Sequence, residues 1–176
     1  MDDAIGQVMA KRASGFEMNV LYYNRHRLPP EEEAAYHLTY TSLDQLLQQA
    51  DFVSIHTPYT RDTHHLISTR EFALMKPTAI LINTARGPIV DEKALVQALQ
   101  TNLIAGAGLD VFEDEPRVEH GLLTMENVVL VPHIGSASLQ TRTLMATTAS
   151  ENIAAHARGQ RPPNILNPEV LQKHAT

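Results

Sequence analysis

The chain contains no cysteine among its 176 residues. It can therefore form no disulfide bond, and it offers neither a thiolate nucleophile nor a sulfur-ligated metal site. The absence of cysteine fits a reducing compartment, and we expect a cytoplasmic protein. The neighbouring His64 and His65 cannot both face one ion on a regular element, so we interpret them as surface residues and predict no metal site.

Long hydrophobic runs and a basic excess are also lacking. No apolar run is long enough to span a bilayer, and the acidic start Met1-Asp2-Asp3 differs from the basic start of a signal peptide. The net charge is −6 and the pI is near 5.8, whereas a nucleic-acid-binding surface requires clustered basic residues. We therefore expect neither nucleic acid nor membrane as a partner. The hydrophobic content of 43% is ordinary for a chain that buries one core.

Helical patterns alternate with short apolar runs along the chain. Helices are predicted at residues 5–14, 43–50, 91–100 and 138–158, and strands at 18–23, 52–56, 79–83, 105–111 and 128–131. Ser68 with Glu71 forms a capping box, and Asp91 caps the helix that follows it. This order predicts an α/β fold with a doubly wound parallel sheet. The strands are apolar rather than alternating, which is typical of a sheet covered by helices on both faces.

Three of these strands end in residues that can carry chemistry. The segments are Asn-Thr-Ala-Arg-Gly at 83–87, Gly-Leu-Asp-Val-Phe-Glu-Asp-Glu-Pro at 108–116 and Val-Pro-His-Ile-Gly-Ser-Ala at 131–137. The carboxyl ends of parallel strands share one edge of the sheet, so a guanidinium, a carboxylate and an imidazole are expected together there. Such a set can hold an anionic substrate and move a proton. Spacing alone does not choose among the three carboxylates of the second segment, and a lone histidine or arginine is often structural.

The three segments resemble the cofactor-domain signatures of the D-isomer-specific 2-hydroxyacid dehydrogenases, and most of all those of the glyoxylate and hydroxypyruvate reductase branch. The resemblance runs from Ile5 to about Val170 and implies an oxidoreductase with a Rossmann-like fold. It implies that His133 is the acid–base residue and that Glu115 orients the His133 ring and stabilises its charged form. It also implies that Arg86 binds the substrate carboxylate.

The same resemblance implies a set of cofactor-binding residues. Asp110 corresponds to the aspartate beside the nicotinamide carboxamide. Thr57 and Pro58 resemble the loop that packs on the cofactor, and Thr84 with Ala85 resembles the backbone near the nicotinamide ribose. The remaining residues of this predicted cofactor set are Arg86, His133 and Gly135.

Gly6 matches the last glycine of the G-x-G-x-x-G turn with which a dinucleotide-binding fold opens. The first two glycines would fall at or before Asp2 and Asp3. By resemblance, the first cofactor strand and the substrate-binding domain are missing. We therefore expect residues 1–160 to be an N-terminally truncated NAD(P)-binding domain and residues 161–176 to be a tail that would return to the missing domain. The alternative is that Gly6 is a small residue in an ordinary helix.

A basic turn stands where an NAD-binding fold places an acidic residue for the adenosine ribose. Its residues Asn24, Arg25 and Arg27 offer two guanidiniums that could bind a 2′-phosphate, with no carboxylate opposing it. NADP is therefore preferred over NAD. The alternative is a solvated basic turn that Glu31, Glu32 and Glu33 balance.

Taken with the resemblance, the sequence predicts the cofactor-binding half of an NAD(P)-dependent glyoxylate or hydroxypyruvate reductase. Its expected partners are a small 2-keto or 2-hydroxy acid and either a second copy, in a homodimer, or a complementing chain. The alternative is an inactive remnant, or one subunit of a split enzyme that acts as a binding module.

Overall fold

The computed structural model describes residues 4–170, so Asp2 and Asp3 lie outside the described residues. The chain divides into two compact units, Met1–His133 and Ile134–Thr176, which are described separately. The boundary that the sequence predicts between residues 160 and 161 stays a prediction.

Helices and strands alternate through the first unit. Its helices are α1 (Ala4–Ser14), α2 (Pro30–Tyr36), α3 (Leu43–Gln49), α4 (Thr69–Leu74) and α5 (Glu92–Gln100), with short 3-10 turns η1 (Arg61–Thr63), η2 (Gly87–Ile89) and η3 (His120–Thr124). Its strands are β1 (Val20–Tyr22), β2 (Leu38–Tyr40), β3 (Phe52–Ile55), β4 (Ile80–Asn83), β5 (Gly106–Leu109) and β6 (Val128–Leu130). The predicted helices and strands of this unit are confirmed to within a few residues, whereas α2 and β2 were not predicted.

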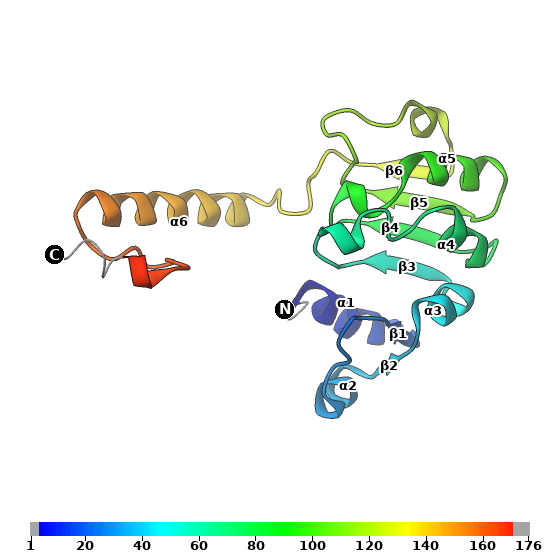
Figure 1. Ribbon diagram of the computed structural model, residues 1–176, viewed down its shortest axis with the longest axis horizontal. Helices are drawn as coiled ribbons and strands as arrows, with labels where there is room; N and C mark the ends of the chain where they lie inside the picture. The colour runs from blue at the N-terminus through cyan, green and yellow to red at the C-terminus, as the bar shows by residue number, and fades with distance from the viewer. Residues whose placement is uncertain (1–3, 171–176) are drawn as a thin grey trace. The chain divides into compact units, whose positions relative to one another are not determined.

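All the strand pairs described are parallel, which confirms the α/β, Rossmann-like class. Strands β3, β4, β5 and β6 lie side by side in that order, with Phe52 opposite Ile80, Ile80 opposite Gly106 and Ala107 opposite Val128 (Figure 1). Strands β1 and β2 form a separate pair in which Val20 is opposite Leu38. Within residues 4–170, β1 pairs with β2 alone and β3 with β4 alone, so the strands form two sheets rather than one.

One face of the four-stranded sheet carries the core. Val53, Leu81 and Leu109 are buried there, and Phe72 of α4 and Leu95 of α5 are fully covered. The opposite face is more open, because Phe52 and Val129 are 52% and 67% exposed. Helix α1 faces β3 and β4 on that side across an apolar hollow of about 330 Å³. Helices therefore lie on both faces of the sheet, as predicted, although within the described part of this unit α1 covers its face only in part.

Side-chain caps fix where the core helices begin. The Ser42 hydroxyl accepts a hydrogen bond from the Gln45 amide at the start of α3, and the Asp91 carboxylate accepts one from the Ala94 amide at the start of α5. The Ser68 amide donates to Glu71 at 3.1 Å, as in the predicted capping box. These bonds satisfy amide groups that have no partner inside the helix, and they set the direction in which each helix leaves the preceding loop.

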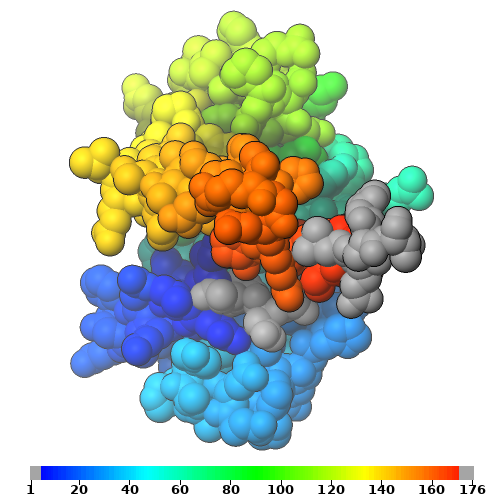
Figure 2. Space-filling model, turned by 90° about the vertical axis from the view of Figure 1, so that its left-hand side faces the viewer, coloured from blue at the N-terminus to red at the C-terminus, as the bar shows by residue number. Residues whose placement is uncertain are grey.

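Polar contacts hold the corner formed by β1, α2 and β2. Gln7 of α1 donates to Glu32 of α2 at 3.1 Å, and in Figure 2 the dark blue surface of α1 adjoins the lighter blue surface of residues 30–40. The Tyr22 hydroxyl donates to Glu33 at 2.6 Å, and the Tyr22 and Tyr40 rings pack edge to face. This corner presents the basic turn at residues 24–27.

The second unit is built on helix α6 (Leu139–Ala157). The Ser138 side chain accepts from the Thr141 amide at its start, and Gly159 follows its end with a φ of 69°, a conformation that glycine adopts without strain. The Asn164 amide donates to Asn152 at 3.0 Å and ties the following segment to α6. None of the helices in residues 4–170 combines the length and apolar character needed to cross a membrane.

Candidate active site

A buried amide shapes the turn after β4. Asn83 is 1% exposed, and its side chain donates to the Arg86 carbonyl at 3.0 Å while accepting from the Ala85 amide at 3.1 Å. These two bonds fold the chain back immediately after the strand. As a result Thr84 and Arg86 are exposed at the carboxyl edge of the sheet.

Asp110 lies next to this turn at the end of β5. Its amide donates to the Asn83 carbonyl at 3.0 Å, which joins the ends of β4 and β5. Its side chain is buried, with 5% of the residue exposed. Asp110, which the sequence predicts to lie near the nicotinamide, is thus buried at the carboxyl edge of the sheet, next to the turn that carries Thr84 and Arg86.

Glu115 and His133 form the central contact of the site. One carboxylate oxygen of Glu115 lies 3.0 Å from Nδ1 of His133, and the other accepts a hydrogen bond from the Phe112 amide at 3.1 Å. The bonds from His133 and Phe112 lower the pKa of the Glu115 carboxyl, and the nearby positive charge of Arg86 adds to this effect. Arg86, Glu115 and His133, which end or follow three different strands, are therefore gathered in one place.

The three carboxylates of the acidic loop have separate partners. Glu113 binds the His65 ring at 2.6 Å, and Asp114 pairs with Arg117 at 2.6 Å. Glu115 is the one that meets His133. Geometry thus distinguishes three residues that their spacing in the sequence could not.

Two backbone segments of the site pack directly against each other at Gly87. A Cβ atom placed on Gly87 would lie 1.9 Å from the carbonyl carbon of Phe112 and 2.4 Å from the Glu113 nitrogen. Only a residue without a Cβ fits such a contact. The turn that carries Arg86 and the loop that carries Glu115 therefore form one packed unit.

The other predicted cofactor residues of the first unit that follow β3 or β4 or belong to α1 lie along the same edge or near it. Thr57 is half-buried and Pro58 exposed after β3, and Ala85 is half-buried after β4. Gly6 is half-buried in the first turn of α1, whose side chains face β3 and β4. Gly135 belongs to the second unit, two residues after His133.

The basic turn differs from the expectation. Arg27 forms two hydrogen bonds to the carboxylate of Glu33, at 2.7 and 2.8 Å, and Arg25 pairs with Asp62 at 3.2 Å. Asn24 accepts from the Arg25 amide at 2.9 Å. The hydrogen bonds from Arg27 and, to a lesser extent, from the Tyr22 hydroxyl lower the pKa of Glu33 to about 2. The prediction that no carboxylate opposes these arginines was wrong, because the unpredicted helix α2 turns Glu33 back toward Arg27.

His65 was also misjudged from the sequence. It is not an ordinary surface residue, because its ring lies between Glu113, at 2.6 Å, and Asp91, at 3.9 Å. Both partners are far along the chain, so no local pattern indicates them. His64 is exposed, as predicted, and its ring stacks on that of His65.

Comparison with known proteins supports this architecture. Residues 3–135 match the family model described as D-isomer specific 2-hydroxyacid dehydrogenase, NAD binding domain. The chain is 50% identical over 167 residues to the glyoxylate reductase of Thermococcus litoralis and 51% identical over 168 residues to that of Pyrococcus horikoshii. These alignments cover 95% and 96% of this chain but 50% of each relative. The chain thus spans about half the length of the curated relatives it matches.

Comparison with solved structures also matches this chain to about half of a longer protein. The TT0316 protein of Thermus thermophilus superposes with a TM-score of 0.83 at 46% identity, covering 92% of this chain and 50% of that one. The NADPH-dependent glyoxylate/hydroxypyruvate reductase of Sinorhizobium meliloti, in complex with NADP and malonate, superposes with a TM-score of 0.79 at 38% identity, covering 86% of this chain and 46% of that one. Because the family model matches most of this chain, the chain belongs to the D-isomer specific 2-hydroxyacid dehydrogenase family and carries its NAD binding domain.

Proposed function

We propose that this chain supplies the cofactor-binding and proton-transfer residues of a glyoxylate or hydroxypyruvate reductase. The observation that carries the proposal is the 3.0 Å contact between Glu115 and His133, with Arg86 close enough to affect the Glu115 carboxyl. A carboxylate beside an imidazole and a guanidinium suits the reduction of a 2-keto acid, because that reaction needs a proton donor and an anion-binding group.

The geometry supports a role for each of the three residues. The ionised Glu115 carboxylate can only accept, so Nδ1 of His133 carries a proton toward it. This leaves Nε2 of His133 to give its proton to the ketone oxygen. The exposed guanidinium of Arg86 can bind the substrate carboxylate through two parallel hydrogen bonds. A bound nicotinamide cofactor would supply the hydride.

The residues of the site fit the nicotinamide end of such a cofactor. Thr84, Arg86, Asp110 and His133 line the carboxyl edge of a parallel sheet, where dinucleotide-binding folds place their ligands. We favour NADP over NAD because Arg25 and Arg27 lie in the basic turn. The pair between Arg25 and Asp62 is exposed, so it is weak and can be exchanged for a phosphate. The ion pair between Arg27 and Glu33 would have to open before Arg27 could bind the 2′-phosphate, and this cost reduces the difference in affinity between NADP and NAD.

Association with another chain is part of the proposal. The strands β1 and β3 each have an unpaired edge within residues 4–170, and such edges favour pairing with another chain. We favour a homodimer or an assembly with a chain that supplies a substrate domain. A cytoplasmic location is supported by the cysteine-free composition.

A second candidate function is supported by the openness of the site. The side chains of His133 and Glu115 are 50% and 38% exposed, whereas hydride-transfer sites work best when water is excluded. A chain with this open edge can serve as an inactive remnant or as the binding subunit of a split enzyme. Under either alternative the isolated chain would reduce no keto acid.

Activity measurements separate the two candidates. We would assay reduction of glyoxylate and hydroxypyruvate, with NADPH and with NADH, by the chain alone and by its fusion to the N-terminal half of the Thermococcus litoralis relative. We expect the fusion to be active and to prefer NADPH, and the chain alone to be much slower because water is not excluded. A folded fusion without activity on either acid would contradict the proposed function.

A further inference from the structure

The acidic loop that carries Glu115 is anchored by its neighbour Glu113. The Glu113 amide donates to the Glu92 carboxylate at 2.7 Å, and the Glu92 amide donates back to the Glu113 carboxylate at 3.3 Å. Glu92 is 6% exposed and Glu113 is half-buried, so this reciprocal pair of bonds lies at the margin of the core, at the start of α5. It fixes the backbone two residues before Glu115.

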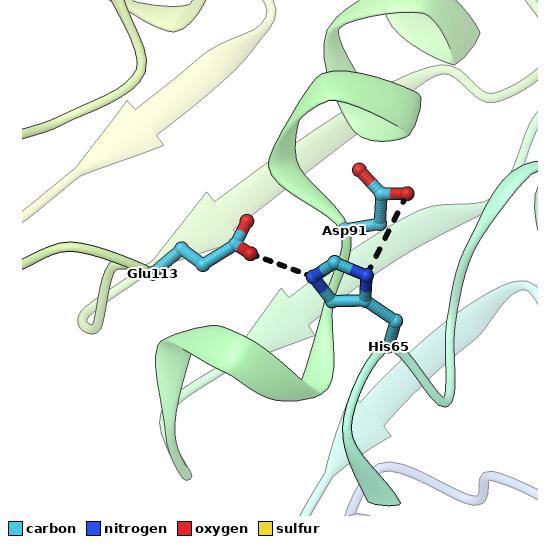
Figure 3. A group of neighbouring side chains, drawn as sticks. All are labelled: His65, Asp91 and Glu113. Atoms are coloured by element: carbon cyan, nitrogen blue, oxygen red, sulfur yellow. Dashed lines mark hydrogen bonds and ion pairs between the residues drawn. The ribbon is translucent and has the colours of Figure 1, made fainter.

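Two carboxylates held this close repel each other. Burial raises the pKa of Glu92, and the charges of Glu113 and Glu119 raise it further. A hydrogen-bond donor aimed at Glu113 offsets this repulsion. The ring of His65 is that donor: its Nε2 lies 2.6 Å from Glu113, whose carboxylate can only accept (Figure 3).

Other contacts hold His65 on the side away from Glu113. Its amide donates to the Pro88 carbonyl at 2.9 Å, in the turn that follows Arg86. Its Nδ1 lies 3.9 Å from Asp91, which accepts from the Ser68 hydroxyl at 2.9 Å and caps α5 (Figure 3). The ring therefore joins two segments of the site, the turn after Arg86 and the loop before Glu115.

We propose that His65 is a positioning residue for the Glu115–His133 pair, acting through Glu113 and the backbone of residues 112–115. This inference deepens the proposed function and rests on it, since it assigns the pair to proton transfer. When His65 holds Glu113, the Phe112 amide stays directed at one oxygen of Glu115 and leaves the other for His133. When His65 is removed, the buried Glu92 carboxylate and the half-buried Glu113 carboxylate separate, and the loop shifts away from His133.

The same three side chains could also suit a cation. The ligand atoms of His65, Asp91 and Glu113 lie within 4.8 Å of one another, at the side of an open hollow of about 700 Å³. The carboxylates, however, already accept bonds from His65, the Ser68 hydroxyl and the amides of Glu92 and Ala94. These bonds fulfil the role that a cation would have, so we favour positioning and make metal binding an outcome of the test.

The test follows the carboxyl resonance of Glu115 against pH by NMR in the full chain. We expect His65→Ala to raise the Glu115 pKa toward the ordinary glutamate value, in the same direction as His133→Ala, because the bonds that lower this pKa loosen. His65→Gln, whose side-chain amide can still donate to Glu113, should restore much of the shift. His120→Ala, which removes an exposed histidine from the same hollow, is the matched control and should leave the Glu115 pKa unchanged.

The outcomes separate positioning from other roles. A folded His65→Ala variant with lower thermal stability but an unchanged Glu115 pKa would show a purely structural role and overturn the proposal. If His65→Ala does not fold, Glu113→Ala carries the same expectation, and an unchanged Glu115 pKa in that variant overturns it equally. Treatment with EDTA should leave the wild-type titration unchanged. If it instead reproduces the His65→Ala titration, and added Zn²⁺ reverses this, the cluster is a cation site.

The NMR titration requires no activity. Its failure would leave the proposed reductase function standing, and an inactive fusion would leave the structural link between His65 and Glu115 standing. In an active fusion we expect His65→Ala to lower kcat by about tenfold or more, since small displacements of catalytic groups have effects of this size.

Discussion

Arg27 and Glu33 form a two-pronged ion pair, with Nε and Nη2 of the guanidinium 2.7 and 2.8 Å from the two carboxylate oxygens. The guanidinium also lies 5.4 Å from the centre of the Tyr40 ring. A cofactor phosphate that approaches this turn must therefore compete with a carboxylate already in place. Under the proposed function, this ion pair links the selectivity for NADP over NAD to helix α2.

We expect Glu33→Gln to strengthen NADPH binding by about three- to fivefold, because it removes the carboxylate that pairs with Arg27, whose own side chain is 61% exposed. Affinity for NADH, which lacks the 2′-phosphate, should change little. Calorimetric titration of both cofactors measures the effect, and Glu31→Gln in the same helix is the matched control. Equal changes for NADPH and NADH would indicate that the basic turn does not contact the 2′-phosphate.

The same pair predicts a pH dependence of folding stability. The bonds from Arg27 and from the Tyr22 hydroxyl lower the pKa of Glu33 from 4.5 to about 2, so the folded state binds the Glu33 proton less readily than the unfolded chain does. The stabilisation is therefore present above about pH 5 and is lost as the pH falls toward 2. Thermal unfolding of the wild type and of Glu33→Gln should differ at neutral pH and converge in acid. A difference of the same size at neutral pH and at pH 2 would mean that the charge of Glu33 does not stabilise the fold.

In an active assembly, His133→Ala should lower turnover by about 10²- to 10⁴-fold, as expected for the loss of a positioned general acid. Arg86→Ala should raise KM as well as slow the reaction, because it removes the proposed carboxylate-binding group. Steady-state kinetics with glyoxylate distinguishes the two patterns, with His120→Ala as the control. Unchanged turnover in His133→Ala would require a different proton donor.

The contact at Gly87 predicts a steep effect on stability. A Cβ atom there would overlap the Phe112 carbonyl, so Gly87→Ala should destabilise the fold by about 3 kcal/mol or more. Gly108 in β5 is a matched control, because a Cβ atom there meets nothing within 4 Å. Urea unfolding of both variants measures the difference. Similar midpoints for Gly87→Ala and the wild type would show that the two loops separate easily.

The edges of β1 and β3 that have no partner strand within residues 4–170 predict self-association of the isolated chain. Light scattering over a concentration series should show dimers or larger species. Phe52→Lys, which places a charge at an exposed position of β3, should reduce association, since charges on edge strands oppose pairing. A stable monomer throughout the series would remove the basis for a homodimer through these edges.

The sequence predicted the elements whose signals are local. The apolar strand patterns located the strands of the four-stranded sheet and their carboxyl edge. Capping residues such as Ser68 and Asp91 located the starts of the helices between these strands. Helix α2 was missed although Pro30 in its first turn and the following glutamates are typical of a helix start. Those residues had been interpreted as the charged surroundings of a loop.

The contacts between distant segments could not be predicted. Nothing near His65 indicates Glu113, and the spacing of three carboxylates does not reveal that Glu115 alone among them meets His133. Such pairings depend on how loops from different strands pack at one edge, which is a property of the folded chain. The family resemblance, rather than the spacing, pointed to Glu115.

The backbone contact between Gly87 and Phe112 also constrains how this site can be engineered or can evolve. Main chain meets main chain there, so no side chain is available to absorb a change in the length or path of either loop. If one loop were exchanged alone, its backbone would pack poorly against the unchanged backbone of the other loop. Residues 83–91 and 110–116 therefore have to be exchanged together if either loop is to be replaced by that of a related protein.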